Sequence, residues 1–498
     1  MPIDDVDIPG SPGWWFKRLA RQQAERARAL KDLQSRYDSE PPLPEGAEQA
    51  RAAYKAFQKL ARTNYEETIV HAVLHRQTPV GFRTAAGGDD GGDSAAARVW
   101  AANEMPVQAS DILESKLSLR EGYAIVGPPD DDSDGQAVIT AEDPRQVITA
   151  HDPVRPSRVR AGLKTFWDPD EELDVAYVYL PGQNGGRAQA WRATRPGKSS
   201  ILGPGFRLAA KAWTWDDRVT EINTSRCPVV RFGNRGGKAE FEKHQDLIDR
   251  IRHTILQRMV IITLQAYRQR AISGLPDRYP DDWPVEALRG QPIDYTNVFT
   301  ADPAAVWMLP ALPAANGGSA MAQIWESGQL DLTPVLSAIK DDVRELASVT
   351  KTPFYSFMPD GANQSAEGAV TQREGINFKV EDHNTRDGIG FAHVMSLAFE
   401  LMNDTEGREK LGQLETLWAP VERYSLAQKA DAAQKAKASG MSARTILTDI
   451  WQMTPQQAQR ELDARADDFL FAVTADRDPI SVPSTRAEVP AALPAVDA

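Results

Sequence analysis

The sequence has a single cysteine, Cys227, among its 498 residues. One cysteine cannot form an intramolecular disulfide, which fits a protein of the reducing cytoplasm. Cys227 is either a functional thiol or a small buried apolar side chain. We expect the second, because free cysteine is among the most buried residue types.

Long hydrophobic runs are also absent. The most apolar run, MVIITL at 259–264, is far shorter than the roughly 20 residues that span a bilayer as a helix. The N-terminus, MPIDDVDIPGSPGWW, carries acidic residues where a signal peptide has basic ones, and no apolar core follows. We therefore expect an intracellular protein that makes no membrane contact.

Motifs of enzymatic chemistry are missing too: there is no GxSxG elbow, no CxxC pair and no cluster of zinc ligands. His71 and His75 lie four residues apart on an expected helix and could reach one metal ion. No glutamate follows His71, and no third ligand can be named. We expect a solvated or half-buried helix face there, and no metal, cofactor or catalytic residue in the chain.

The segment PGKSS at 196–200 resembles the end of a phosphate-binding loop, GxxxxGK[ST]. The first glycine of that pattern is replaced by Arg192, and Gly203, Pro204 and Gly205 interrupt the helix that should follow. A β-turn is the expected structure. A packaging ATPase that uses Lys198 is kept as an alternative, which predicts that Lys198→Ala abolishes ATP turnover.

Basic residues are fewer than acidic ones, which gives the chain a formal net charge of −13. Proteins that grip nucleic-acid phosphates tightly are usually basic. No zinc finger and no basic region followed by heptads is present. If duplex DNA is a partner, we expect it to be guided along the protein without sequence readout.

What the chain does contain is a mixture of helical and strand patterns, which indicates an α+β protein. Apolar spacing predicts helices at 14–37, 47–75 and about 95–118. A β-rich insertion at 120–232 follows, with alternating runs at 137–140, 146–149, 174–180 and 188–194.

The segment 241–271 predicts a long helix, because no proline or glycine interrupts it. At about 1.5 Å per residue, the helix would exceed about 40 Å. Its apolar stripe has no obvious partner within the chain, so we expect neighbouring copies to cover it in a closed ring. The predicted interface residues are Leu247, Ile251, Ile255, Met259 and Ile262.

The rest of the chain alternates between loops and helices. Residues 272–333 are rich in proline, glycine and acids, with two expected strands at 296–299 and 305–309. The other expected elements are a helix at 334–350, a loop at 351–363, a long polar helix at 364–402, two or three alanine-rich helices in 425–471 and a disordered tail from about 474.

Several motifs occur in the order of a known family. They are GWW at 13–15, L-x₂-L at 30–33 with Tyr37 and PLP at 42–44, RTNYEETIVHAVLHRQTPVGF at 62–82, CPVVRFGN at 227–234 and AYRQRAISGLP at 266–276. Together they resemble the SPP1-type portal family of tailed phages, in the variety found in phages of actinobacteria. The resemblance covers about residues 10–470.

The resemblance implies a portal fold with a helical stem, a wing with a β-rich insertion, a crown and a small α/β clip. It divides the chain into an N-terminal wing (1–240, insertion 120–232), first stem helix (241–271), clip (272–333), second stem helix (334–350), tunnel loop (351–363), long wing helix and connection (364–419), crown (420–472) and disordered tail (473–498).

The resemblance also implies a function without enzymatic activity. The expected assembly is a ring of twelve subunits at one capsid vertex of the virion, put together in the host cytoplasm. Its channel would pass double-stranded DNA without sequence specificity during packaging and ejection. The expected protein partners are the terminase large subunit, a head–tail connector or adaptor, and the major capsid or scaffolding protein.

A few inward-facing cations would keep DNA centred in an otherwise negative channel. The candidates are Lys340, Arg344 and Lys351, on or just after the second stem helix. The alternative for each is ordinary surface pairing with Asp341, Asp342 and Glu345. A minor head protein that binds the capsid without forming a channel is a further alternative for the whole chain.

Overall fold

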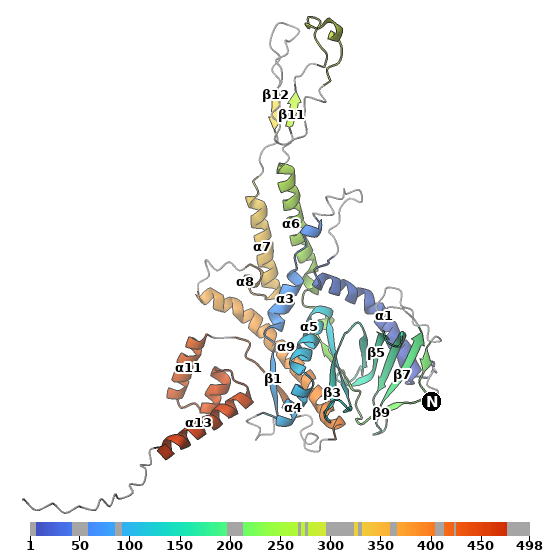
Figure 1. Cartoon of the computed structure of the whole chain (residues 1–498), viewed down its shortest axis with the longest axis vertical. Coiled ribbons are helices and arrows are strands. Elements are labelled where there is room, and N and C mark those ends of the chain that lie inside the picture. The colour runs from blue at the N-terminus through green and yellow to red at the C-terminus, as the bar shows by residue number, and fades with distance from the viewer. Residues whose placement is uncertain are drawn as a thin grey trace, which may run out of the picture.

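The computed structural model describes residues 6–41, 58–84, 92–196, 213–266, 270–273, 277–294, 323–326, 331–358, 366–403, 413–422 and 425–475. Helices and strands are mixed in these ranges, so the predicted α+β class is confirmed. A body of helices and two larger sheets carries two long helices that project from one end, and a group of helices from the C-terminal part lies to one side (Figure 1).

The first N-terminal helix begins two residues before its prediction, and the second predicted helix is interrupted. Helix α1 (Pro12–Tyr37) begins at Ser11, whose hydroxyl accepts a hydrogen bond from the Trp14 amide at 3.1 Å. Helix α3 (Tyr65–Leu74) begins at Asn64, which caps it in the same way through the Glu67 amide. Residues 61–64 are not helical, so one helix over 47–75 was wrong there; 47–57 lie outside the described residues.

The predicted helix at 95–118 is in fact two helices, α4 (Ser94–Ala102) and α5 (Met105–Leu119). The break falls at Asn103 and Glu104, and Glu104 has a left-handed backbone with φ of 49°. Proline is favoured in the first turn of a helix, where its missing N–H costs nothing. Pro106 stands in the first turn of α5 and was the available signal for a new start.

The β-rich insertion is confirmed and forms two antiparallel sheets. The larger is ordered β4 (Val147–His151), β5 (Val159–Asp168), β6 (Leu173–Leu180), β7 (Ala188–Pro196), β8 (Thr214–Trp215), with β9 (Thr220–Ile222) also on β7. The smaller is ordered β10 (Val229–Gly233), β2 (Glu121–Gly127), β3 (Val138–Glu142). Trp15, Phe16 and Leu19 of α1 are buried against the larger sheet.

Helix α9 (Ala366–Leu401), predicted at 364–402, is the central support of the body. It packs on β2 and β10 and on β13 (Leu414–Trp418), which pairs with β1 (Pro79–Thr84). At Gly390 an added Cβ would lie only 2.4 Å from a ring carbon of Phe232. A side chain there would push the helix off the sheet, so this contact requires glycine.

The two projecting helices are α6 (Gln245–Ala266) and α7 (Thr333–Thr350), and they lie side by side (Figure 1). The prediction of one helix over 241–271 was wrong at both ends. A 3₁₀ turn, η3 (Glu242–His244), precedes α6. Strand β11 (Arg270–Ser273) follows it and pairs antiparallel with β12 (Gln323–Glu326). The strands expected at 296–299 and 305–309 lie outside the described residues.

After α7 the predicted loop contains a single helical turn, α8 (Phe354–Phe357), and 359–363 lie outside the described residues. The C-terminal helices are confirmed as α11 (Leu426–Ala438), α12 (Ala443–Thr445) with a π turn at Ile446–Ile450, and α13 (Pro455–Ala475). Helix α13 therefore extends past the expected start of the tail at 473, and 476–498 lie outside the described residues.

Candidate functional site

The projecting pair of helices is held together by apolar side chains of its own chain. Ile248, Ile251 and Leu256 of α6 are almost completely buried. Helix α7 buries one face with Ile339, Val343, Leu346, Ala347 and Thr350. Their spacing of three and four residues places them on a single stripe. The hairpin is thus a packed unit before any second copy is considered.

An ion network fastens the base of α6 to the N-terminal helices. The Arg252 guanidinium, 2 % exposed, forms an ion pair with Glu66 and donates at 2.8 Å to the Thr63 carbonyl. Arg36 of α1 donates two hydrogen bonds of 2.9 Å to Asp249. Burial raises the pKa of Glu66, against the opposing charge of Arg252. The ion pair therefore does not fully offset the cost of desolvating this carboxylate.

The predicted interface stripe on α6 is only partly open to a neighbour. Ile251 is 0 % exposed within its own chain, so the prediction that it contacts another subunit was wrong. The reason is that α7 and the body cover this face of the helix. Leu247 and Ile255 are partly buried against the same core, Met259 is half-buried, and Ile262 is 47 % exposed. The exposed end of the stripe remains a predicted subunit contact.

The three predicted channel cations are all exposed. Lys340 and Arg344 lie within about 40° of each other around α7, whereas Asp342 lies roughly opposite them and Glu345 about 100° from Arg344. Those two acids pair with Arg250 of α6. Of the surface pairings considered for the cations, only Arg344 with Asp341, at 2.8 Å, is present among the described residues.

Lys351 ends α7 in a left-handed conformation with φ of 56°. The Thr352 amide donates at 3.0 Å to the Ala347 carbonyl, which closes the last turn. Lys351 lines a cavity of about 400 Å³ together with residues of α9 and of the turn before α6. Of the three predicted cations, Lys340 and Arg344 therefore lie on the side of α7, and Lys351 lies at a cavity by the end of that helix.

A buried polar network runs from α5 through α9 toward that cavity. The Lys116 ammonium, 0 % exposed, lies 2.6 and 2.8 Å from the Asp387 carboxylate oxygens and 2.9 Å from His383 Nδ1. An ammonium only donates, so His383 Nδ1 accepts and Nε2 carries the proton. That proton points to Glu240, whose Oε1 is 3.2 Å away.

Glu240 also pairs with Lys379 at 2.6 Å. Burial alone would raise the pKa of Glu240, but the hydrogen bond from His383 and the charge of Lys379 hold it well below its usual range. Sequence reasoning missed this network. Lys116 and Asp387 are 271 positions apart, and no local pattern marks either of them.

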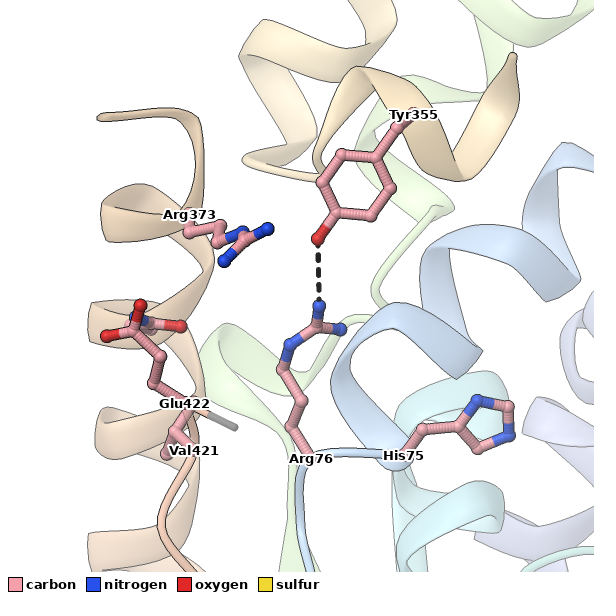
Figure 2. Close-up of a pocket in the computed structure, with 7 residues that line it drawn as sticks. His75, Arg76, Tyr355, Arg373, Val421 and Glu422 are labelled. Carbon is pink, nitrogen blue, oxygen red and sulfur yellow. Dashed lines mark hydrogen bonds between the residues drawn. The ribbon is translucent and has the colours of Figure 1, made fainter. Parts of the chain in front are cut away.

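A second cavity, of about 320 Å³, lies where α3, α8, α9 and the chain entering the C-terminal helices meet. Arg76 donates from Nη1 to the Ala72 carbonyl at 2.6 Å and from Nη2 to the Tyr355 hydroxyl at 3.2 Å. Figure 2 shows the Arg373 side chain extending toward this pair from α9. The contact ties α8, and so the chain after α7, to the end of α3.

The other sequence candidates do not form a site in the described part of the chain. His71 Nε2 lies 3.1 Å from the Tyr37 hydroxyl, and its ring lies 4.8 Å from that of His75. No group of three metal-binding side chains occurs in the described ranges. Of PGKSS, Pro196 ends β7 and the remainder lies outside those ranges. Nor does any helix there have the length and apolar character to cross a membrane.

Comparison with known proteins gives the family. Residues 19–468 match the family model described as "Phage portal protein, SPP1 Gp6-like". The chain belongs to this family of phage portal proteins. The portal protein of Mycobacterium phage L5 is 23 % identical over 396 residues, which cover 77 % of this chain and 74 % of the relative. That of Mycobacterium phage D29 is 23 % identical over 394 residues, covering 76 % and 73 %.

The resemblance drawn from the ordered motifs is therefore confirmed, and with it the portal role. The family is a structural class of phage capsid protein that serves DNA packaging.

Proposed function

We propose that this portal chain forms a closed ring of twelve subunits at one vertex of the phage head, with an axial channel for double-stranded DNA. The observation that carries the proposal is the projecting hairpin of α6 and α7. Its far end keeps apolar side chains exposed, with Ile262 at 47 % and Leu336 at 43 %. Repetition of the same contact around a rotation axis buries such surface in every copy and leaves a hole at the centre.

The proposed division of labour follows the chain. Helices α6 and α7 are the stem, and the segment 272–333, which includes β12, is the clip that docks the terminase large subunit and later the head–tail connector. Residues 1–240 and 364–419 form the wing that meets the capsid or scaffolding protein, and 420–472 the crown. The ring is assembled in the host cytoplasm and stays in the virion. No bond is made or broken by this protein.

Charge explains how DNA passes through without sticking. A chain with a net charge of −13 repels the phosphates of the duplex over most of its surface. Lys340 and Arg344 supply cations on α7, and we propose that they face the channel and keep the duplex centred; Lys351, the third cation predicted for the channel, lines the cavity at the end of α7 instead. Few such contacts per subunit leave DNA binding weak and insensitive to sequence.

Electron microscopy of the full chain, viewed down the particle axis and combined with native mass measurement, tests the ring. We expect closed rings with an axial hole at least about 20 Å wide, the width that a duplex with its grooves requires. A stable monomer in the presence of scaffolding protein would contradict the proposal. Capsid-bound particles with no hole would instead indicate a minor head protein.

The channel cations have their own test. Lys340→Gln with Arg344→Gln should leave ring formation intact, because both side chains are exposed, and should slow DNA packaging several-fold in an in vitro packaging assay. The exposed Arg187→Gln, just before β7, is the matched control and should package normally. Packaging at the wild-type rate in the double variant would place these cations away from the DNA.

The packaging-ATPase alternative is tested by Lys198→Ala. We expect no ATP turnover by the purified wild-type chain and no effect of the substitution on packaging driven by the terminase. Hydrolysis by the wild-type chain that disappears in the variant would overturn the proposal of a non-enzymatic conduit.

A further inference from the structure

The cavity at the end of α7 is strongly basic in an otherwise acidic chain. We call it the basic pocket. It has a volume of about 400 Å³ and lies between α7, α9 and the turn that precedes α6. Its lining includes two acids, Glu240 and Asp382. The cations that line it are Arg235, Lys238, Lys243, Lys351 and Lys379.

Three of these cations form ion pairs among the described residues, and two do not. Arg235 pairs with Asp382, Lys238 with Glu242 and Lys379 with Glu240. Lys243 and Lys351 form no ion pair with any residue that the structure describes. Positive charge gathered in a concave surface produces a focused field, since low-dielectric walls concentrate it. The basic pocket is therefore prepared for an anionic group.

Exposed apolar side chains beside the basic pocket indicate which kind of anionic group it would bind. Val349 and Phe378 also line the cavity, and they are 47 % and 61 % exposed. An exposed aromatic ring gains from covering by apolar atoms. A sugar–phosphate backbone offers charge and little apolar surface, whereas a peptide can place a carboxylate next to an apolar side chain. The combination favours an acidic peptide over nucleic acid.

We propose that the basic pocket binds an acidic segment of a second copy of this chain, with a carboxylate between Lys243 and Lys351 and an apolar side chain against Phe378. The proposal rests on the ring proposed above. In a ring built head to tail, each copy offers one surface and receives a different one. The pocket lies at the root of the α6–α7 hairpin, so it would add a second contact between copies, separate from the one at the exposed far end of the hairpin.

The chain itself carries segments of the required chemistry. Trp167, 43 % exposed, precedes Asp168 at the end of β5, and Phe469, 69 % exposed, follows Asp467 and Asp468 on α13. In each case an acidic residue and an exposed aromatic residue are neighbours in the sequence of one short segment. A second copy therefore offers candidate segments that combine acidic charge with an exposed aromatic residue.

Charge reversal tests the pocket in the full-length chain. Lys243→Glu with Lys351→Glu should raise the concentration needed for ring assembly at least tenfold in mass photometry, with an unchanged circular dichroism spectrum because both side chains are exposed. Phe378→Ser should weaken assembly in the same direction. The matched control is Arg187→Glu, an exposed cation outside the pocket, with assembly as in the wild type.

Cross-linking identifies the occupant. A photoreactive benzophenylalanine at Phe378, in rings mixed from ¹⁴N and ¹⁵N chains, should give cross-linked peptides of mixed isotope content that contain acidic residues. Cross-links to DNA in filled heads, or only within one chain, would overturn the proposal. The pocket proposal would also be overturned if the charge reversal left ring assembly unchanged. In that case the proposed ring would still stand. A wild-type chain that stays monomeric would contradict both the pocket proposal and the ring proposal.

Discussion

Replacing Arg252 with methionine is expected to lower the free energy of unfolding by about 3–5 kcal/mol, the usual cost of removing one partner from a buried ion pair. The guanidinium is 2 % exposed and the Glu66 side chain 0 %. Methionine fills most of the space but leaves the buried Glu66 carboxylate with Arg36, 3.9 Å away, as its remaining counter-charge. It also removes the hydrogen bonds to the Thr63 carbonyl. Urea denaturation followed by circular dichroism measures the loss.

The loss should grow with pH. Burial already raises the pKa of Glu66 in the wild type, with Arg252 opposing it, and the substitution removes that opposing charge. A carboxyl whose folded pKa exceeds its unfolded value binds more protons when folded, so stability falls as pH rises through that window. The Arg252→Met variant should therefore lie closer to the wild type at pH 5 than at pH 8. An equal loss at both pH values would contradict a further rise in the pKa of Glu66 in the variant.

Arg250→Met is the matched control, two residues away on the same helix. Its partners Asp342 and Glu345 belong to α7, and the Arg250 side chain is 50 % exposed. Water and salt screen such a pair, so the urea midpoint should hardly move. If both substitutions had the same effect, the base of α6 would not depend on the buried contact with α3, and the support proposed for the stem would be wrong.

Local patterns predicted the elements whose stability is local. Helix α7 begins one residue before the prediction of 334–350, because Thr333 and Pro334 form a favourable first turn. Helix α9 is also within two residues of its predicted bounds. The alternating runs after residue 136 became β3, β4, β6 and β7. In each case side-chain periodicity and helix-end chemistry give the same answer.

Predictions failed where a partner far along the chain decides the structure. The sequence RAIS at 270–273 is compatible with a continued helix, yet it forms β11, since β12 pairs with it and places Trp325 opposite Ala271. Ile251 reads as one point of an uncovered stripe, but the body and α7 cover it completely. The basic pocket is a similar case, because Lys243, Lys351 and Lys379 come together only when the turn η3, the end of α7 and α9 are packed.

Helix α9 links these parts, because it touches the sheets, the buried network and the basic pocket. His383 and Lys379 line the pocket, and both also bind Glu240. His383 in turn receives a hydrogen bond from the Lys116 ammonium. The charge pattern of the pocket is thus set partly by a residue of α5 that solvent does not reach.

Replacing Lys116 with methionine is expected to destabilise the fold by about 3–5 kcal/mol, again because a buried carboxylate loses its counter-charge. Asp387 is 1 % exposed. Of the contacts described, only the hydrogen bond from Gln77, at 2.9 Å, would remain to its carboxylate. His383 Nδ1 would lose its donor and become free to change tautomer, which would weaken the hold on Glu240. Urea denaturation of the full chain measures the free energy.

A second substitution separates charge from packing. Lys116→Met with Asp387→Asn removes both charges, while the new side-chain amide can still accept a hydrogen bond from Gln77, so the double variant should be more stable than Lys116→Met alone. Lys435→Met is the matched control: this lysine is 75 % exposed, pairs with Asp431 at 2.7 Å and should cost less than about 0.5 kcal/mol. A double variant as unstable as the single one would mean that the packing of the lysine stem, and not its charge, joins α5 to α9.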